Sequence, residues 1–310
     1  MSGARDRRVA AELRASIRGE VREAESLARY STYRIGGPAT VLLPAVPEDV
    51  AIGLTTASSR GIPWFVLGLG SNVLLPDDGL DALVIRIGKG LDRVDQDGER
   101  WRLGAGLPAP IAARRTAQAG WAGLHMMVGV PGTVGGGVFM NAGCHGGQWS
   151  DTVETVVAVD ARGQSRVFAA AEIPFRYRQS GIDGWVVLET TVRLRPGDAG
   201  QLADEVTKLF EWRQRGTPFN QPCCGSVFKN PVGDRTAGQL IEAAGLKGTR
   251  VGGAEVSPMH ANYFVNTGSA TAADVRALIA LVRGKVAERF GTELEAEVKI
   301  VGSAGERFRV

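Results

Sequence analysis

Two glycine-rich segments are the first places where this sequence could do chemistry. GLGSN occupies residues 68–72, and GVPGTVGGGVFMNAGCHGG occupies residues 129–147. Glycines let successive main-chain N–H groups converge on the oxygens of an anion, and no acidic residue occurs from Gly104 to Ser150 to repel one. Two such loops suit the pyrophosphate of a bound dinucleotide. The alternative is that both are only tight turns beside packed strands.

Three spots carry side chains that could take part in a reaction. Arg176 and Arg178 lie two residues apart in FRYRQS, so an extended segment would point both to one face, although a solvated strand edge would look the same. Ser226 follows a glycine in CCGSVFKNP and either faces a site or is only a turn serine. Glu295 and Glu297 share one face of the strand predicted for LEAEVKIVG, where surface alternation is the usual explanation.

Several common sites are disfavoured by missing residues. GAGLPA at 104–109 has the spacing of a Rossmann fingerprint, but the acid needed about 20 residues later to hold a ribose hydroxyl is absent. The sequence has no P-loop, no G-x-S-x-G elbow and no H-E-x-x-H zinc motif. With three histidines in the chain, we expect no metal site.

The cysteines predict neither a disulfide nor a metal site. Cys144, Cys223 and Cys224 are an odd number, and an adjacent pair closes a disulfide or chelates one metal poorly. We therefore expect three reduced thiols.

Composition places the chain among globular proteins. It has 310 residues, of which 44% are hydrophobic and 22% charged, and this length predicts two or three packing units. The net charge of +3 is too small to indicate a nucleic-acid surface. No apolar run reaches the roughly 18 residues of a membrane span, and the start MSGARDRRVAAELRASIRGE lacks the pattern of a secretory signal. We expect a cytoplasmic protein.

The elements that must position these groups begin with α/β alternation and continue with a block rich in strands. Apolar spacing and end signals predict helices over 8–20, 48–60 and 108–119. Strands are predicted over 64–67, 73–75, 82–87, 101–106 and 185–195, with a hairpin over 155–169.

After residue 200 the pattern becomes mostly helical, which indicates a separate unit. Helices are predicted over 201–214 and 238–245. A last helix begins at Thr271, which forms a capping-box pair with Asp274.

Seven motifs, in order along residues 20–302, resemble those of the UDP-N-acetylenolpyruvoylglucosamine reductase (UDP-N-acetylmuramate dehydrogenase) family. They are YRIGG (33–37), LGLGSN (67–72), VGVPGTVGGGVFMNAG (128–143), FRYRQS (175–180), CGSVFKNP (224–231), AGLKGTRVGGAEVSPMHANYFVN (244–266) and LEAEVKIVG (294–302). The direct run from FRYRQS into the strand at 185 is similar to the shorter, type II-like form of the family.

The resemblance implies an α+β fold, with a two-subdomain FAD-binding fold of the vanillyl-alcohol-oxidase type and a smaller α/β substrate domain. The implied limits are an N-terminal helical extension at 1–30, an FAD-binding domain at 31–200 with subdomains at about 31–84 and 85–200, a substrate-binding domain at 201–292, and a strand at 293–310 returning to the FAD-binding half.

The resemblance also implies the roles of individual residues. The implied catalytic residues are Arg178, Ser226 as proton donor and Glu297. The implied contacts to non-covalent FAD are Gly68, Leu69, Gly70, Ser71, Asn72, Val73, Val130, Pro131, Gly132, Thr133, Gly136, Gly137, Asn141 and Gly143.

The implied reaction uses NADPH to reduce FAD, after which hydride passes to UDP-N-acetylglucosamine enolpyruvate for peptidoglycan precursor synthesis. The implied substrate contacts are Arg213, Lys229, Asn230 and His260. We expect a monomer with no nucleic-acid partner and no membrane insertion.

One departure from the family pattern affects the substrate contacts. Many members have Gln-Pro where this chain has Thr217-Pro218, which leaves open whether Arg213 or Arg215 meets the substrate.

Two other functions are alternatives to this reductase activity. They are an FAD-dependent oxidase or dehydrogenase acting on another substrate, and a nucleotide-diphosphate binding module without redox chemistry.

Overall fold

The computed structural model describes residues 3–303 and 307–308, and the chain divides into two compact units. Unit 1 comprises residues 1–23, 40–69 and 82–213, and unit 2 comprises residues 24–39, 70–81 and 214–310. No helix in the described ranges is long and apolar enough to cross a membrane.

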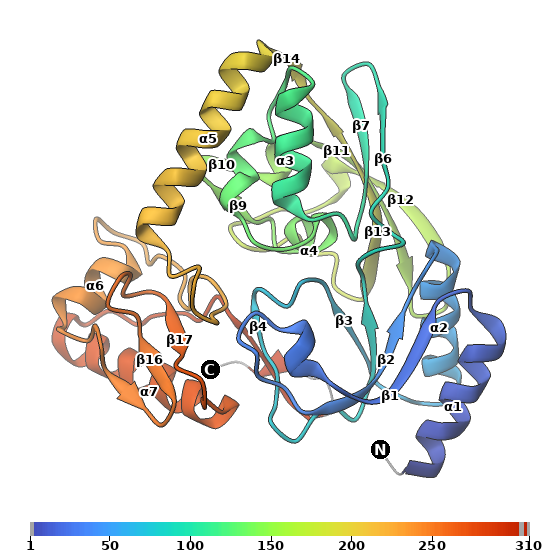
Figure 1. Ribbon diagram of the computed structural model, residues 1–310, viewed down its shortest axis with the longest axis horizontal. Coiled ribbons are helices and arrows are strands. Elements are labelled where there is room, and N and C mark those ends of the chain that lie inside the picture. Colours follow the sequence, from blue (N-terminus) through green and yellow to red (C-terminus); the bar gives the residue numbers. More distant parts are fainter. Residues whose placement is uncertain (1–2, 304–306, 309–310) are drawn as a thin grey trace. The chain divides into compact units, whose positions relative to one another are not determined.

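The first half of unit 1 is built on a four-stranded sheet with the order β1-β2-β5-β3. Its strands are β1 (Glu20–Ser26), β2 (Pro38–Leu43), β5 (Leu83–Arg86) and β3 (Trp64–Leu67), and β2, β5 and β3 run parallel. The helices α1 (Gly3–Ser16) and α2 (Pro47–Ser59) lie side by side next to it (Figure 1). Leu83 and Ile85 pack close to Gly53 of α2, so the apolar side chains of β5 meet the helix layer.

The second half of unit 1 is an antiparallel sheet with the order β12-β11-β13-β7-β6. Its strands are β12 (Ser165–Ala169), β11 (Val153–Asp160), β13 (Trp185–Arg193), β7 (Arg100–Gly104) and β6 (Val94–Asp97). The chain forms the helices α3 (Ala109–Gln118) and α4 (Val134–Phe139) between β7 and β11, and the long helix α5 (Ala199–Gly216) comes after β13 (Figure 1). A short strand, β8 (Trp121–Ala122), pairs with β14 (Arg195–Pro196).

Unit 2 has its own apolar core, around α6 (Ala237–Ala243) and α7 (Ala272–Phe290). The strands β15 (Arg250–Val251), β16 (Ala254–Val256) and β17 (Phe264–Asn266) form an antiparallel sheet, and β15 and β16 contact α7. A second small sheet joins β4 (Val73–Leu74) in parallel to β18 (Lys299–Val301), which pairs with β19 (Arg307–Phe308). Strand β18 is therefore paired with the segment that directly follows the first glycine loop.

Most of the predicted elements form, and the capping box of α7 is confirmed. Thr271 Oγ1 accepts the Asp274 N–H at 3.1 Å, and the Asp274 carboxylate accepts the Thr271 N–H at 3.0 Å. The helix predicted over 8–20 ends earlier than predicted: α1 stops at Ser16, and strand β1 begins at Glu20.

The strand predicted over LEAEVKIVG is wrong in its first half. Regular pairing covers only Lys299–Val301, and Ala296 makes a single antiparallel bridge to Phe228. Glu295 and Glu297 therefore flank an isolated bridge instead of lying on a continuous strand.

Candidate active site

The first glycine loop begins where β3 ends, and in unit 1 it meets the second glycine segment. A Cβ on Gly68 would lie 2.8 Å from Thr133 Oγ1, so only glycine allows this approach. Thr133 is the N-cap of α4, where its Oγ1 accepts the Gly136 N–H at 3.2 Å. The two segments that the sequence predicts as anion-binding loops are thus in contact.

The N–H groups at this contact are available to a ligand. Among the residues that the structure describes, none accepts a hydrogen bond from the main-chain N–H of Gly68, Leu69, Gly132 or Thr133. Gly132 has a φ of +133°, which other residues rarely adopt. Unpaired N–H groups beside a surface without acidic side chains are what a pyrophosphate requires, so these residues fit the diphosphate of FAD.

Some glycines of the second segment have packing roles. A Cβ on Gly137 would lie 2.3 Å from Nε1 of the buried Trp149, and one on Gly135 would lie 2.8 Å from Ala105 Cβ. These two residues let α4 lie close to its neighbours. Val130 and Pro131 lead into this helix, and Val130 donates its N–H to Met127 O at 3.0 Å.

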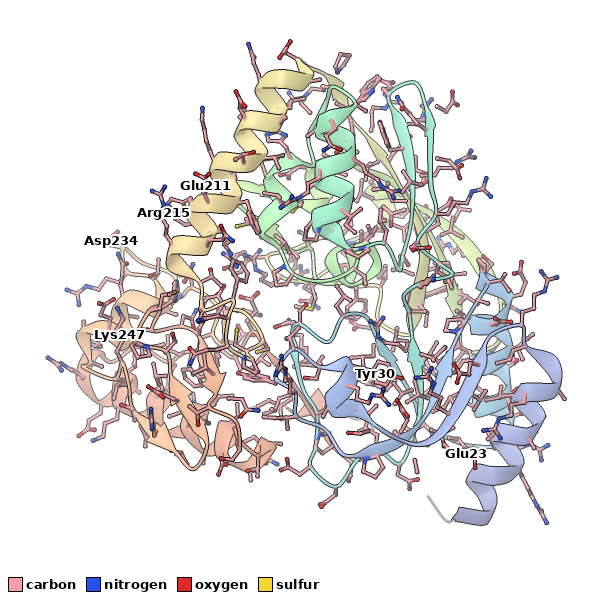
Figure 2. The ribbon with its side chains drawn as sticks, viewed as in Figure 1. Glu23, Tyr30, Glu211, Arg215, Asp234 and Lys247 are labelled. Carbon is pink, nitrogen blue, oxygen red and sulfur yellow. The ribbon has the colours of Figure 1, made fainter. Side chains whose placement is uncertain are left out.

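Gly70, in unit 2, forms a tight turn in the first glycine loop. Its φ is +64°, and a Cβ there would lie 2.1 Å from the carbonyl oxygen of Tyr30, a residue labelled in Figure 2. The Gly70 carbonyl accepts hydrogen bonds from the N–H and the Oγ1 of Thr32, both at 3.2 Å. The close approach to Tyr30 and the hydrogen bonds from Thr32 therefore fix the turn at Gly70. Leu69, Ser71 and Asn72 are its neighbours in the same loop.

We expect Gly70→Ala to weaken FAD binding by at least tenfold, because its Cβ forces the loop away from Tyr30. The matched control is Gly98→Ala. Gly98 also has a positive φ, +56°, but apart from its chain neighbours no described residue has an atom within 4 Å of its Cβ position. The control variant pays only the conformational cost of about 1–2 kcal/mol. Titration of each apoprotein with FAD measures the difference, and equal affinities in the two variants would contradict this role.

The FRYRQS segment is a tight turn, and the predicted extended conformation is wrong. Arg176 and Gln179 exchange two main-chain hydrogen bonds, of 2.8 and 3.1 Å, with Arg178 inside the turn at a φ of +58°. Tertiary contacts favour this conformation, because Asn141 Nδ2 donates to Arg176 O at 3.0 Å. The N–H and Oγ of Ser180 both donate to Phe139 O, at the end of α4.

The turn aims Arg178 at the second glycine segment. Its Nη2 donates to Gly143 O at 3.0 Å, and its guanidinium lies 4.7 Å from the ring centroid of Tyr177. Asn141 is almost fully buried and also accepts the Ser150 N–H at 3.0 Å. Of the predicted residues, Arg178, Asn141 and Gly143 are therefore brought together in unit 1.

Unit 2 brings together Ser226, Glu297 and Asn72. The Glu297 N–H donates to Val227 O at 2.8 Å, and Asn72 Nδ2 donates to Glu297 O at 3.3 Å. Gly225 has a φ of +72°, and its Cβ position lies 3.9 Å from Ser71 O. The Lys299 N–H donates to Asn72 O at 3.0 Å, one residue before β4 and its Val73. Hydrogen bonds thus link the residue after Ser226, the main chain of Glu297 and Asn72 of the first loop.

The thiol beside this turn is buried, which disfavours its reactive thiolate form. Cys224 is buried, and burial is the largest cause that raises the pKa of its thiol well above the ordinary range. The three cysteines are free, as the sequence predicts.

Of the four predicted substrate residues, Arg213 lies in unit 1, where its Nη1 donates to Cys144 Sγ at 3.7 Å, and the other three have partners within unit 2. Lys229 Nζ forms an ion pair with Glu295 at 2.6 Å, and Asn230 Oδ1 accepts the Ala237 N–H at 3.1 Å at the start of α6. His260 Nδ1 accepts the Asn262 N–H at 3.2 Å, and its ring packs edge-on against Tyr263.

One supporting residue is missing from the sequence prediction. Asn262 is buried, and its side-chain amide makes two hydrogen bonds to the main chain of Phe228. Its Oδ1 accepts the Phe228 N–H at 2.9 Å, and its Nδ2 donates to Phe228 O at 2.8 Å. The main-chain carbonyl of Asn262 accepts the Val227 N–H at 2.9 Å. It fixes the backbone directly after Ser226. A polar residue inside the apolar stretch HANYFVN was the signal that could have found it.

Residues 38–168 match the family model described as FAD binding domain. With the α+β fold, this match and the relatives below define an FAD-dependent oxidoreductase. Residues 217–301 match the model described as UDP-N-acetylenolpyruvoylglucosamine reductase, C-terminal domain. The chain belongs to the UDP-N-acetylenolpyruvoylglucosamine reductase family.

The relatives match over most of their length. The reductase of Rubrobacter xylanophilus is 46% identical, with 90% of this chain and 94% of the relative covered. That of Halalkalibacterium halodurans is 42% identical, with 94% and 97% covered. The crystal structure of the reductase from Thermus caldophilus has a TM-score of 0.79 and 33% identity, with 91% of this chain and 99% of that chain covered.

Proposed function

We propose that this protein reduces UDP-N-acetylglucosamine enolpyruvate to UDP-N-acetylmuramate with NADPH, as a cytoplasmic step of peptidoglycan precursor synthesis. The names of its relatives support the substrate. The observation that carries the proposal is the hydrogen bond from the Glu297 N–H to Val227 O, because it fixes an acid beside the turn that bears Ser226. The domain limits given above, with FAD bound in 31–200 and substrate in 201–292, are part of the proposal.

Each of the three catalytic residues has a distinct task. FAD, when bound, would supply the hydride-transfer chemistry, with NADPH as the reductant. Hydride addition to the terminal alkene carbon builds negative charge on the neighbouring carbon and its carboxylate, and Arg178 neutralises that charge. Ser226 donates its hydroxyl proton to the neighbouring carbon and is reprotonated from its surroundings, while Glu297 supports the charge when protonated or through water. One hydride and one proton complete the reduction.

The product provides the test of the substrate. Incubation with NADPH and UDP-N-acetylglucosamine enolpyruvate is expected to give a product heavier by two hydrogen atoms, with one NADPH consumed per product, as followed by mass spectrometry and absorbance. A parallel incubation with NADH compares the two reductants. NADPH consumption that does not depend on the enolpyruvate would point to another oxidoreductase activity.

A prediction on the cofactor follows from the loops. We expect FAD to be released into the supernatant by acid precipitation, because the unpaired main-chain N–H groups of the glycine loops would hold its diphosphate without a covalent bond. Chromatography of the supernatant identifies the flavin. A yellow chromophore that stays on the precipitated polypeptide would contradict non-covalent binding.

A further inference from the structure

A short antiparallel ladder joins the segment after Ser226 to the acids of LEAEVKIVG. It consists of residues 227–229 and 295–297, and its centre is the isolated bridge between Phe228 and Ala296. One main-chain hydrogen bond lies on each side of that bridge, as in a regular antiparallel pair. The ladder therefore sets the register of the serine turn against the segment that bears the catalytic acid.

The two ends of the ladder are held by different bonds. At the end nearer the serine, Val227 O accepts the N–H groups of Glu297 and Val298, at 2.8 and 3.3 Å. At the other end, the Lys229 N–H donates to Glu295 O at 2.9 Å. The first end continues into strand β18, whereas the second end is open.

An ion pair closes this open end. Residues 292–295 lie outside helices and strands, so fraying of the ladder would start at Glu295. Lys229 Nζ lies 2.6 Å from Glu295 Oε1, which adds a side-chain link to the main-chain bond between the same two residues. The Lys229 side chain is only 19% exposed, so its ammonium group would be costly to keep in place without the carboxylate.

We propose that Lys229 and Glu295 are positioning residues that clamp the open end of this ladder and thereby hold Ser226 in register with Glu297 for proton donation. The inference rests on the proposed function, and it gives a task to Glu295, which has none in that function. It also changes the task of Lys229, because an ammonium group neutralised by a carboxylate at 2.6 Å attracts an anionic substrate less. Lys229 then acts through Glu295 and not on the nucleotide sugar.

Loss of this clamp would change the rate of one step and leave substrate binding alone. The hydrogen bonds from Asn262 and the burial of Phe228 persist without the ion pair, so the displacement of Ser226 is partial. Misplacement of a catalytic group by about 1 Å costs up to about 10²-fold in rate. We therefore expect flavin reoxidation to slow by about tenfold, at an unchanged dissociation constant of the enolpyruvate.

Exchange of the two charges tests the clamp. Lys229→Glu and Glu295→Lys each place two like charges at the open end, and each is expected to slow reoxidation by the enolpyruvate about tenfold at saturating substrate in anaerobic stopped flow. The double variant, which combines Lys229→Glu with Glu295→Lys, restores an opposite pair and is expected to reoxidise within about threefold of the parental rate. A lysine that binds the substrate itself could not be rescued in this way, because the double variant has a carboxylate at position 229.

A second ion pair of the same type and length in unit 2 supplies the matched control. Lys247, labelled in Figure 2, lies 2.6 Å from Glu242 of α6, and the two side chains are 30% and 60% exposed, against 19% and 72% in the clamp. Lys247→Glu is expected to reoxidise at the parental rate, since neither residue of this pair belongs to the ladder. All variants are compared at matched flavin content and with an unchanged rate of reduction by NADPH, which separates a loss of positioning from a folding defect.

Four results would overturn the inference and leave the proposed function standing. They are a double variant as slow as the single variants, single variants that reoxidise at the parental rate, single variants that bind the enolpyruvate more weakly without a slower reoxidation at saturation, and an equal slowing in Lys247→Glu. A parent protein whose reduced flavin does not react with the enolpyruvate overturns the proposed function, and the inference with it.

Discussion

Ser226→Ala is expected to leave the reduction of FAD by NADPH nearly unchanged and to slow flavin reoxidation by the enolpyruvate by about 10²–10⁴-fold, the usual contribution of a positioned proton donor. Only the second half of the reaction places a proton on carbon. The loss corresponds to about 3–5 kcal/mol of activation free energy. Anaerobic stopped-flow absorbance of the flavin follows each half separately.

Two further variants sharpen this experiment. Ser226→Cys restores an acidic hydrogen at the same position and is expected to recover part of the lost rate, which a purely structural role would not predict. Ser165→Ala, on the exposed strand β12, is the control and is expected to leave both halves unchanged. If Ser226→Ala slows both halves equally, or neither, the serine is a turn residue and the proton donor lies elsewhere.

Arg178→Gln is expected to slow flavin reoxidation by about 10²–10³-fold, because the guanidinium stabilises charge that develops only in the transition state. Arg178→Lys keeps the positive charge but lacks the planar, forked set of N–H groups of a guanidinium, so an intermediate rate is expected. Both variants keep a side chain at the same positive φ, so backbone strain is matched. Stopped-flow reoxidation at saturating substrate measures the effect.

Arg176→Gln is the internal control for that comparison. Arg176 is exposed in the same turn, and its main chain makes the hydrogen bonds that close it. The control is therefore expected to reoxidise at the parental rate. A loss as large as that of Arg178→Gln would mean that the turn, and not the guanidinium of Arg178, sets the rate.

Sequence reasoning predicted the elements with strong local signals. The capping box of α7 forms because Thr271 and Asp274 satisfy each other's N–H groups without help from distant residues. The second glycine segment stands out in the sequence because it is dense in glycine and no acidic residue occurs from Gly104 to Ser150. Its contact with the first loop, through Gly68 and Thr133, required the fold.

Two predictions, the extended conformation of FRYRQS and the strand over the first half of LEAEVKIVG, were wrong because contacts with other parts of the chain decide these segments. The turn at Arg178 needs a positive φ at a non-glycine residue, and hydrogen bonds from Asn141 and Ser180, which are distant from one another in sequence, favour it. The first half of LEAEVKIVG has the alternation of a strand, but its partner is the irregular segment around Phe228 and not a strand. Neither partner can be read from local periodicity.

Anaerobic titration of the parent protein asks whether one flavin passes two electrons from NADPH to the enolpyruvate. One equivalent of NADPH per flavin is expected to bleach the absorbance near 450 nm, and one equivalent of UDP-N-acetylglucosamine enolpyruvate is expected to restore it with formation of UDP-N-acetylmuramate. Flavin that NADPH bleaches and that the enolpyruvate leaves bleached would contradict the proposed reaction.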